Sequence, residues 1–237
     1  MPTGVIVNAL AVLIGGIVGG VGGKYLSEKF KTEINMIFGL ASMTMGIIAI
    51  APTKNMAAVI FALIIGTAVG LLLHVSAWIN RGAFQMQRII ARFVPANKTL
   101  SEEEFSASLL TVIVLFVSSG TGIYGALVNG MTGDATILDF FTGAIFAANL
   151  GFVVSLIAVP QFVVLMILFL LAGVIYPLTT PAMIIDFKAV GGTLMLATGF
   201  RMIKVRMFPT ADMIPAMLFI MPISWAWTTW VLPLLAK

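Results

Sequence analysis

The sequence predicts an all-α protein that crosses a membrane several times, and its composition is the first reason. Hydrophobic residues make up 60% of the 237 residues, charged residues make up 9%, and the mean hydropathy is +1.12. Soluble domains carry roughly 25% charged residues, so this chain cannot build an ordinary water-facing surface. The charges are also clustered, and the apolar stretches between them reach about 20 residues, the length of helix that crosses a bilayer.

Eight such stretches are predicted as spans of one transmembrane domain over residues 1–237. As one helix, 139–177 would be about 58 Å long at roughly 1.5 Å per residue, about twice the thickness of the hydrocarbon core. Proline breaks helices, so we place a tight turn at Pro160–Gln161; a re-entrant pair is the alternative. The predicted spans are 4–22, 34–51, 56–78, 107–129, 139–158, 161–177, 187–203 and 213–235.

The basic residues predict the orientation of the chain. Cytoplasmic loops of membrane proteins are rich in Lys and Arg. With eight spans and both termini outside, ten basic residues lie in inside loops and three lie outside, whereas seven spans would give eight and five. The N-terminus has no basic segment or cleavage site of a signal peptide, so we expect the first span to be retained.

The long connection 79–106 is predicted to contain an amphipathic helix on the cytoplasmic membrane surface. Basic residues recur on one face at helical spacing, and apolar residues such as Phe84 and Ile89 occupy the other. Basic amphipathic helices bind anionic lipid headgroups; a docking site for a soluble partner is the alternative. The residues predicted to face the membrane surface are Arg81, Arg88 and Arg92.

Glycine spacing suggests internal symmetry and close helix packing. Gly39 and Gly46 are seven residues apart, as are Gly192 and Gly199, in spans that cross in opposite directions in the predicted topology. We interpret this as an inverted repeat of spans 1–3 and 6–8, an architecture common in secondary transporters; chance is the alternative. Small residues also mediate helix contacts, within one chain or in a homodimer, and the glycines concerned are Gly15, Gly19, Gly66 and Gly70.

Polar residues inside the spans are the candidates for a solute pathway. The fourth span contains the spacing G-x-G-x-x-G, but that dinucleotide motif requires a preceding strand. The glycine and hydroxyl residues of 118–125 either allow close helix packing or mark a broken helix that lines a polar cavity. Buried amides either join helices or bind a solute. The pathway candidates are Asn8, Ser118, Ser119, Thr121, Tyr124, Asn129, Asn149 and Gln161.

Two acidic residues follow the fourth span. Asp134 and Asp139 are either turn residues or a negatively charged outer mouth that favours cations.

Several functional classes are disfavoured by what the sequence lacks. The chain has no cysteine and one histidine, and no zinc spacing, Walker motif or catalytic triad is present. We therefore expect no enzymatic activity, no cofactor and no metal site. The basic residues lie in short loops beside spans, which indicates the lipid bilayer rather than nucleic acid as the partner.

Long segments resemble one family. The segments FGLASMTMGI (38–47), IVLFVSSGTGIYGALVNGMTGD (113–134), DFFTGAIFAANLG (139–151) and DFKAVGGTLMLATGFRM (186–202) are similar to the YqgA/YdfK family, closest to its YqgA branch. The resemblance implies a multi-pass protein of the bacterial inner membrane, and it transfers no ligand-binding residue. Leu71 and Asn129 stand where relatives often carry acidic residues, and 134–139 is shorter, which weakens the cation hypothesis.

The resulting hypothesis is a small secondary transporter or facilitator of a polar solute or ion, with its site near the membrane midplane. Hydroxyl, amide and backbone groups would set its specificity. The alternative is a non-transporting accessory or sensor protein that acts through 79–106.

Overall fold

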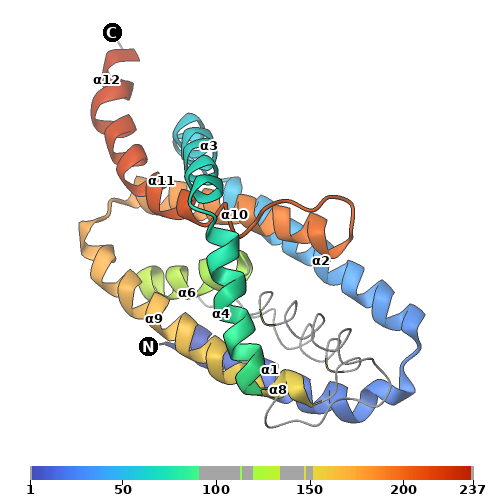
Figure 1. Cartoon of the computed structure of the whole chain (residues 1–237). Coiled ribbons are helices and arrows are strands. Elements are labelled where there is room, and N and C mark those ends of the chain that lie inside the picture. Colours follow the sequence, from blue (N-terminus) through green and yellow to red (C-terminus); the bar gives the residue numbers. More distant parts are fainter. Residues whose placement is uncertain (1, 91–112, 114–119, 134–146, 148–151, 236–237) are drawn as a thin grey trace. The chain divides into compact units, whose positions relative to one another are not determined.

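The computed structural model describes residues 2–90, 113, 120–133, 147 and 152–235, and the elements in this part of the chain are helical, without strands (Figure 1). Five of the described helical segments are long and apolar enough to cross a membrane, and the bent pair α3–α4 would make a sixth. The predicted all-α membrane fold is confirmed. Most of the predicted spans 107–129 and 139–158 lies outside the described residues.

The chain forms two compact units, Met1–Phe38 with Trp78–Val174 and Gly39–Ala77 with Ile175–Lys237. In the first unit, the buried side chains Val5, Ala126 and Leu165 form a core cluster against which residues of α9 pack. Within the part of the chain that the structure describes, the helices with most of their residues in this unit are α1 (Thr3–Gly22), η1 (Gly23–Tyr25), α4 (Val75–Ile90), α6 (Gly120–Thr132), α8 (Val153–Leu156) and α9 (Ala158–Ile175).

The second unit contains the last half of α2. In this unit, both α3 and α10 pack against α11. Pro222 lies inside α11, and the chain after this helix continues as a π-helical turn before its last helical turn. Its elements are α2 (Glu28–Ile50), α3 (Met56–Leu72), η2 (Tyr176–Leu178), α10 (Pro181–Met202), α11 (Pro215–Ala226), η3 (Trp227–Val231) and α12 (Leu232–Leu235).

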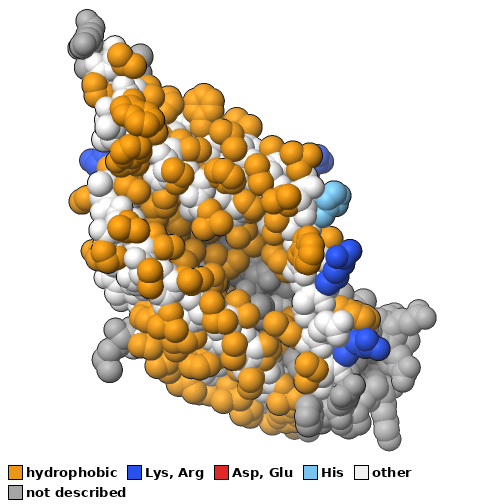
Figure 2. All heavy atoms as spheres, turned by 60° about the vertical axis from the view of Figure 1, so that its left-hand side comes forward, with side chains coloured by type: hydrophobic (Ala, Val, Ile, Leu, Met, Phe, Trp, Pro, Cys, Tyr) orange, Lys and Arg blue, Asp and Glu red, His pale blue; other side chains and the backbone are white. Residues whose placement is uncertain are grey.

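The outward-facing side chains are largely apolar, as expected for helices surrounded by lipid. Hydrophobic side chains cover most of the face shown in Figure 2. Leu218 is 70% exposed and Leu170 is 60% exposed, and both lie on helices long enough to span a bilayer. Apolar surface of this extent marks an interaction with a membrane or a partner.

The seventh predicted span begins six residues earlier than expected. The sequence placed its start at residue 187, but α10 begins at Pro181. The Thr180 side chain accepts a hydrogen bond from the Met183 amide, and proline at the first helical position costs no backbone bond. Asp186 is therefore inside the helix and not in a loop.

The third predicted span, 56–78, is not one straight helix. α3 ends at Leu72, and α4 begins at Val75 at a bend of 60°. His74 lies at the break with a positive φ of 54°, a left-handed conformation that interrupts helical geometry. The predicted connector helix therefore begins inside the predicted span.

The predicted turn at Pro160–Gln161 is absent, because α9 runs through both residues. The irregularity lies upstream, where the Ile157 amide bonds to the Val154 carbonyl with a tighter, three-residue spacing. Pro160 is the third residue of α9, where the lack of an amide hydrogen leaves no helical bond unmade.

The backbones of α2 and α10 touch at two levels through the glycine pairs. A Cβ atom added to Gly46 would lie 2.5 Å from the Gly192 carbonyl oxygen, and one added to Gly192 would lie 2.6 Å from the Gly46 carbonyl oxygen. Likewise, a Cβ atom at Gly199 would lie 2.6 Å from the Gly39 carbonyl oxygen. The helices are therefore antiparallel here.

We predict that Gly192→Ala destabilises the protein by about 1–3 kcal/mol, because overpacking must separate two backbones. Gly173→Ala is the matched control, since nothing lies within 4 Å of its added Cβ, and it should be neutral or slightly stabilising. The measurement is the free energy of unfolding in mixed detergent micelles. Equal effects of the two variants would contradict the contact.

Candidate functional site

Asp186 is a fully buried carboxylate in the second turn of α10, with 0% of its surface exposed. Its Oδ1 atom accepts hydrogen bonds from the Lys54 amide at 3.1 Å and the Asn55 amide at 3.0 Å. Its Oδ2 atom accepts bonds from the Asn55 side-chain amide at 2.8 Å and the Ser224 hydroxyl at 2.7 Å. These partners belong to the α2–α3 connection and to α11, so one carboxylate joins three segments.

The remaining polar partner in this cluster comes from the π-helical turn. The side-chain amide of Asn55 also donates to the Thr228 hydroxyl at 3.2 Å. Asn55 precedes the first residue of α3, so the carboxylate of Asp186 accepts amide hydrogens next to the positive end of this helix dipole. A structural cap and a functional anion are both consistent with this geometry.

A second buried carboxylate lies in the connection between α10 and α11. Asp212 is 4% exposed and its Oδ1 atom accepts a 2.8 Å hydrogen bond from the Ser76 amide in the first turn of α4. A Cβ atom added to Gly70 would lie 1.9 Å from the Asp212 carbonyl oxygen, so this connection packs against the end of α3. Asp212 therefore stabilises the α3–α4 bend from outside both helices.

Arg201 holds the same connection in place. Its Nη1 atom donates to the Phe208 carbonyl and to the Thr210 hydroxyl, both at 2.9 Å.

The two connections share a sequence signal that the glycine spacing alone did not reveal. Residues 52–56 read Pro-Thr-Lys-Asn-Met, and residues 209–213 read Pro-Thr-Ala-Asp-Met. Their fourth positions are Asn55 and Asp212, which are both buried hydrogen-bonding residues. Asp186 was not predicted as a site residue, because the expected start of the seventh span at residue 187 placed its charge in the preceding loop.

In the first unit, Asn129 joins α6 to the start of α1. It is 2% exposed, its Oδ1 atom accepts the Gly4 amide at 3.2 Å, and its side-chain amide donates to the Gly133 carbonyl at 3.1 Å. Gly133 has a positive φ of 79° directly after α6. Both ends of the Asn129 amide are thus engaged within the chain.

Asn8 and Gln161, two predicted pathway residues, are both buried in this unit, at 6% and 0% exposure. The Asn8 Oδ1 atom has no hydrogen-bond partner among the described residues. The hydroxyl oxygen of Ser155, a residue that sequence analysis did not select, is likewise buried without a partner in that part of the chain. A Cβ atom at Gly16 would lie 2.3 Å from this oxygen, so Ser155 presses against α1.

The other predicted pathway residues are less fully placed. α6 is continuous from Gly120 to Thr132, so the described part of the predicted fourth span is unbroken at Gly122 and Gly125, and the broken-helix interpretation is left untested at 114–119, outside the described residues. Thr121 and Tyr124 lie on this helix. The candidates outside the described residues are Ser118, Ser119, Asn149, Asp134, Asp139 and Arg92.

The glycines proposed for a dimer contact are all buried within the chain. A Cβ atom at Gly66 would lie 2.3 Å from the Ala216 Cα atom, and Gly70 packs against Asp212. Gly15 and Gly19 lie on the buried face of α1. Packing within the chain accounts for these glycines, and the homodimer stays a prediction.

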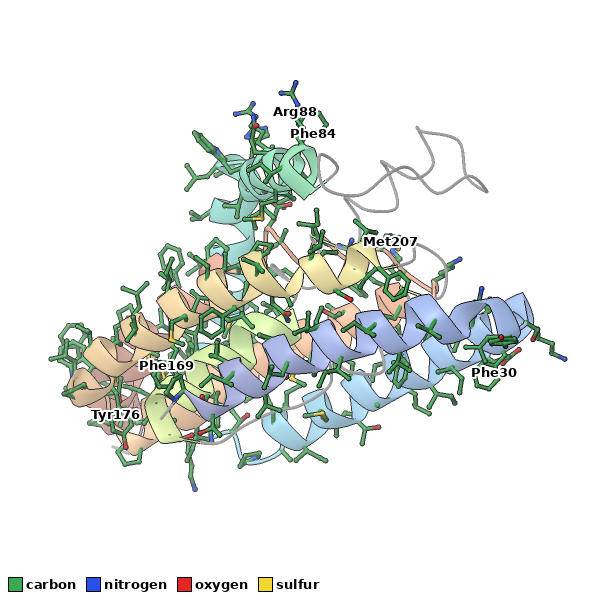
Figure 3. All side chains as sticks on the ribbon, turned by 90° about the horizontal axis from the view of Figure 1, so that it is seen from below. Phe30, Phe84, Arg88, Phe169, Tyr176 and Met207 are labelled. Carbon is green, nitrogen blue, oxygen red and sulfur yellow. The ribbon has the colours of Figure 1, made fainter. Side chains whose placement is uncertain are left out.

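The predicted basic helix corresponds in its described part to α4. The Arg81 guanidinium lies 5.6 Å from the Trp78 ring centroid, and that of Arg88 lies 5.7 Å from the Phe84 ring centroid. Figure 3 shows Phe84 and Arg88 together on this helix. Trp78 and Phe84 are 68% and 46% exposed, so aromatic and basic groups occur together on its surface.

Comparison with known proteins assigns the chain to a family. Residues 3–225 match the family described as "Protein of unknown function (DUF554)". The chain belongs to this family. It is 41% identical over 236 residues to "Uncharacterized protein YqgA" of Escherichia coli strain K12, covering 97% of this chain and 99% of that protein. It is 24% identical over 221 residues to "Uncharacterized membrane protein YdfK" of Bacillus subtilis strain 168, covering 91% and 92%.

The predicted resemblance is thus confirmed, and membership in a membrane-protein family agrees with the apolar helices. No solved structure matches the chain.

Replacement of Asn129 by alanine should cost about 1–3 kcal/mol, because the Gly4 amide and Gly133 carbonyl lose their buried partner. Thr44→Ala serves as the control, since Thr44 is exposed and bonds only the Leu40 carbonyl of its own helix. Unfolding in detergent micelles provides both free energies. A change below about 0.5 kcal/mol for Asn129→Ala would show that this bridge does not stabilise the first unit.

Proposed function

We propose that this chain is a small secondary transporter or facilitator that moves a polar solute or ion across the bacterial inner membrane. The observation that carries the proposal is a pair of buried oxygens in the first unit, Asn8 Oδ1 and Ser155 Oγ, that have no hydrogen-bond partner among the described residues. Buried polar atoms in folded proteins almost always have a hydrogen-bond partner. The hydrocarbon core offers none, so water or a solute inside the protein is the natural partner.

The two oxygens lie at different levels along α1. Asn8 belongs to the buried face of this helix, and Ser155 contacts the same helix at Gly16. Eight residues separate the two levels, about 12 Å at the helical rise of roughly 1.5 Å per residue. Two polar positions that follow one another along α1 fit a path for a solute better than one isolated buried polar atom would.

The chemistry of these positions indicates the class of solute. Amide and hydroxyl groups are uncharged, and Gln161 adds a second buried amide in the same unit. Such groups match a small polar solute, or an ion that sheds part of its hydration shell, and they select by hydrogen bonding rather than by fixed charge.

Internal symmetry supports the same proposal. α2–α3 and α10–α11 each carry a glycine pair followed by a Pro-Thr-x-(Asn/Asp)-Met segment. The glycines of α2 and α10 contact each other reciprocally. An inverted repeat of spans 1–3 and 6–8, with both termini outside, accounts for these features and is a recurrent transporter architecture.

A second candidate function is that of an accessory or sensor protein, and α4 favours it. Exposed Trp78 and Phe84 beside Arg81 and Arg88 would place α4 at the surface of an anionic leaflet. A protein of this kind needs no water-filled path, so the two functions differ in the hydration of the first unit.

Cysteine labelling tests the transporter proposal, since the chain has no cysteine of its own. We expect Asn8→Cys and Ser155→Cys to react in membranes with a small, impermeant thiol reagent, because their surroundings contain water. Leu165→Cys is the buried apolar control, at 0% exposure, and Thr132→Cys is the exposed control. If Asn8→Cys and Ser155→Cys stay as inert as Leu165→Cys while Thr132→Cys reacts, the transporter proposal fails.

A further inference from the structure

The carboxylate of Asp186 has no acceptor position left for another ligand. An ionised carboxylate offers about four acceptor positions, and four donors fill them here. A metal ion or a cationic solute would have to displace those donors. The cluster is therefore suited to hold protein segments together and not to bind cargo.

The segments held by Asp186 meet at the end of the second unit where α10 begins. Asp186 belongs to α10, Asn55 stands directly before α3, and Ser224 belongs to α11. Each bond joins residues that are far apart in sequence, so separation of any one segment must break bonds to a buried charge. In the predicted topology this is the outer end.

We infer that Asp186 is a latch that keeps the outer end of the second unit closed, and that its release opens this end. The inference rests on the proposed transport function, in which each end opens in turn. Asp186 acts by positioning the Pro-Thr-Lys-Asn-Met segment and not by contact with the solute.

The carboxylates at the repeat-related positions, Glu33 and Asp212, hold no equivalent set of four bonds among the described residues, which is the second reason for the inference. Asp186 stands six residues before Gly192, and Glu33 stands six residues before Gly39. Asp186 is buried, whereas Glu33 is exposed. Asp212, which matches Asn55, bonds the Ser76 amide at the α3–α4 bend. Different hydrogen bonds therefore hold the two ends that the repeat relates. A transporter with alternating access has one end open and the other closed in each of its states, so such a difference between the ends is expected.

The test uses Asp186→Asn, which keeps size and shape but turns one acceptor oxygen into a donor. Ala58→Cys reports on the latched end, because Ala58 is 0% exposed and lies in the first turn of α3. Ala197→Cys reports on the other end of α10, where Ala197 is 5% exposed. We expect labelling of Ala58→Cys to accelerate about tenfold or more, since hydrogen bonds to a buried charge are strong, with Ala197→Cys unchanged.

Two further variants separate a latch from a general loss of folding. Ser224→Ala removes one of the four bonds and should accelerate Ala58→Cys labelling less than Asp186→Asn does. Asn55→Asp in the Asp186→Asn background restores a carboxylate facing an amide and should slow the labelling again. Circular dichroism and size-exclusion chromatography of each variant in detergent establish that it is folded.

Three outcomes would overturn the latch. The first is an unchanged labelling rate of Ala58→Cys in the Asp186→Asn background. The second is an equal acceleration of labelling at Ala58→Cys and at Ala197→Cys. The third is that Asp186→Asn fails to fold and that folded Ser224→Ala does not accelerate the labelling of Ala58→Cys. None of these readouts depends on Asn8 or Ser155. If Asp186→Asn behaves as a released latch while Asn8→Cys and Ser155→Cys stay inert, the transport proposal is rejected and the latch is kept. If those two cysteines react while Asp186→Asn leaves the labelling of Ala58→Cys unchanged, only the latch is rejected.

Discussion

The second unit depends on the direct contact between the backbones of α2 and α10. Gly46 and Gly192 each place a carbonyl oxygen where the other glycine would carry a side chain. This close approach lets the Ser42 hydroxyl reach the Met195 carbonyl at 3.0 Å across the interface. In lipid, where apolar burial between helices gains little, such packing and polar contacts are the main sources of association. The same two helices lead into the α2–α3 connection and Asp186, which are joined by hydrogen bonds.

The membrane imposes a second constraint, because every polar group inside it must be satisfied by the protein or by enclosed water. Asp186 shows a complete solution, with four donors around one carboxylate. Asn8 and Ser155 show an incomplete one, with oxygens that have no partner among the described residues. We interpret the difference as a division of roles, in which the second unit holds a latch and the first provides a polar path.

Much of this arrangement could be predicted from the sequence, and the failures share one physical cause. Composition alone predicts a helical membrane protein, and the seven-residue glycine spacing singled out two helices that contact each other. Asp186 looked like a loop charge because its donors lie more than 30 residues away along the chain. The Pro160 turn was wrong because a proline breaks a helix interior but not its first turn. Next to the bend at His74, the Ser76 amide donates to Asp212, 136 residues away. Local sequence patterns reflect interactions between residues close in sequence, so they cannot identify a hydrogen-bond partner that is distant along the chain.

We propose that α2–α3 and α10–α11 form an inverted repeat, with their matching connections on opposite sides of the membrane. Lys54→Cys and Met207→Cys place one reactive group on each connection, and both positions are exposed (Figure 3 labels Met207). In sealed vesicles of known orientation, an impermeant thiol reagent should label Lys54→Cys from the periplasmic side and Met207→Cys from the cytoplasmic side. Labelling of both from the same side would contradict the inverted repeat.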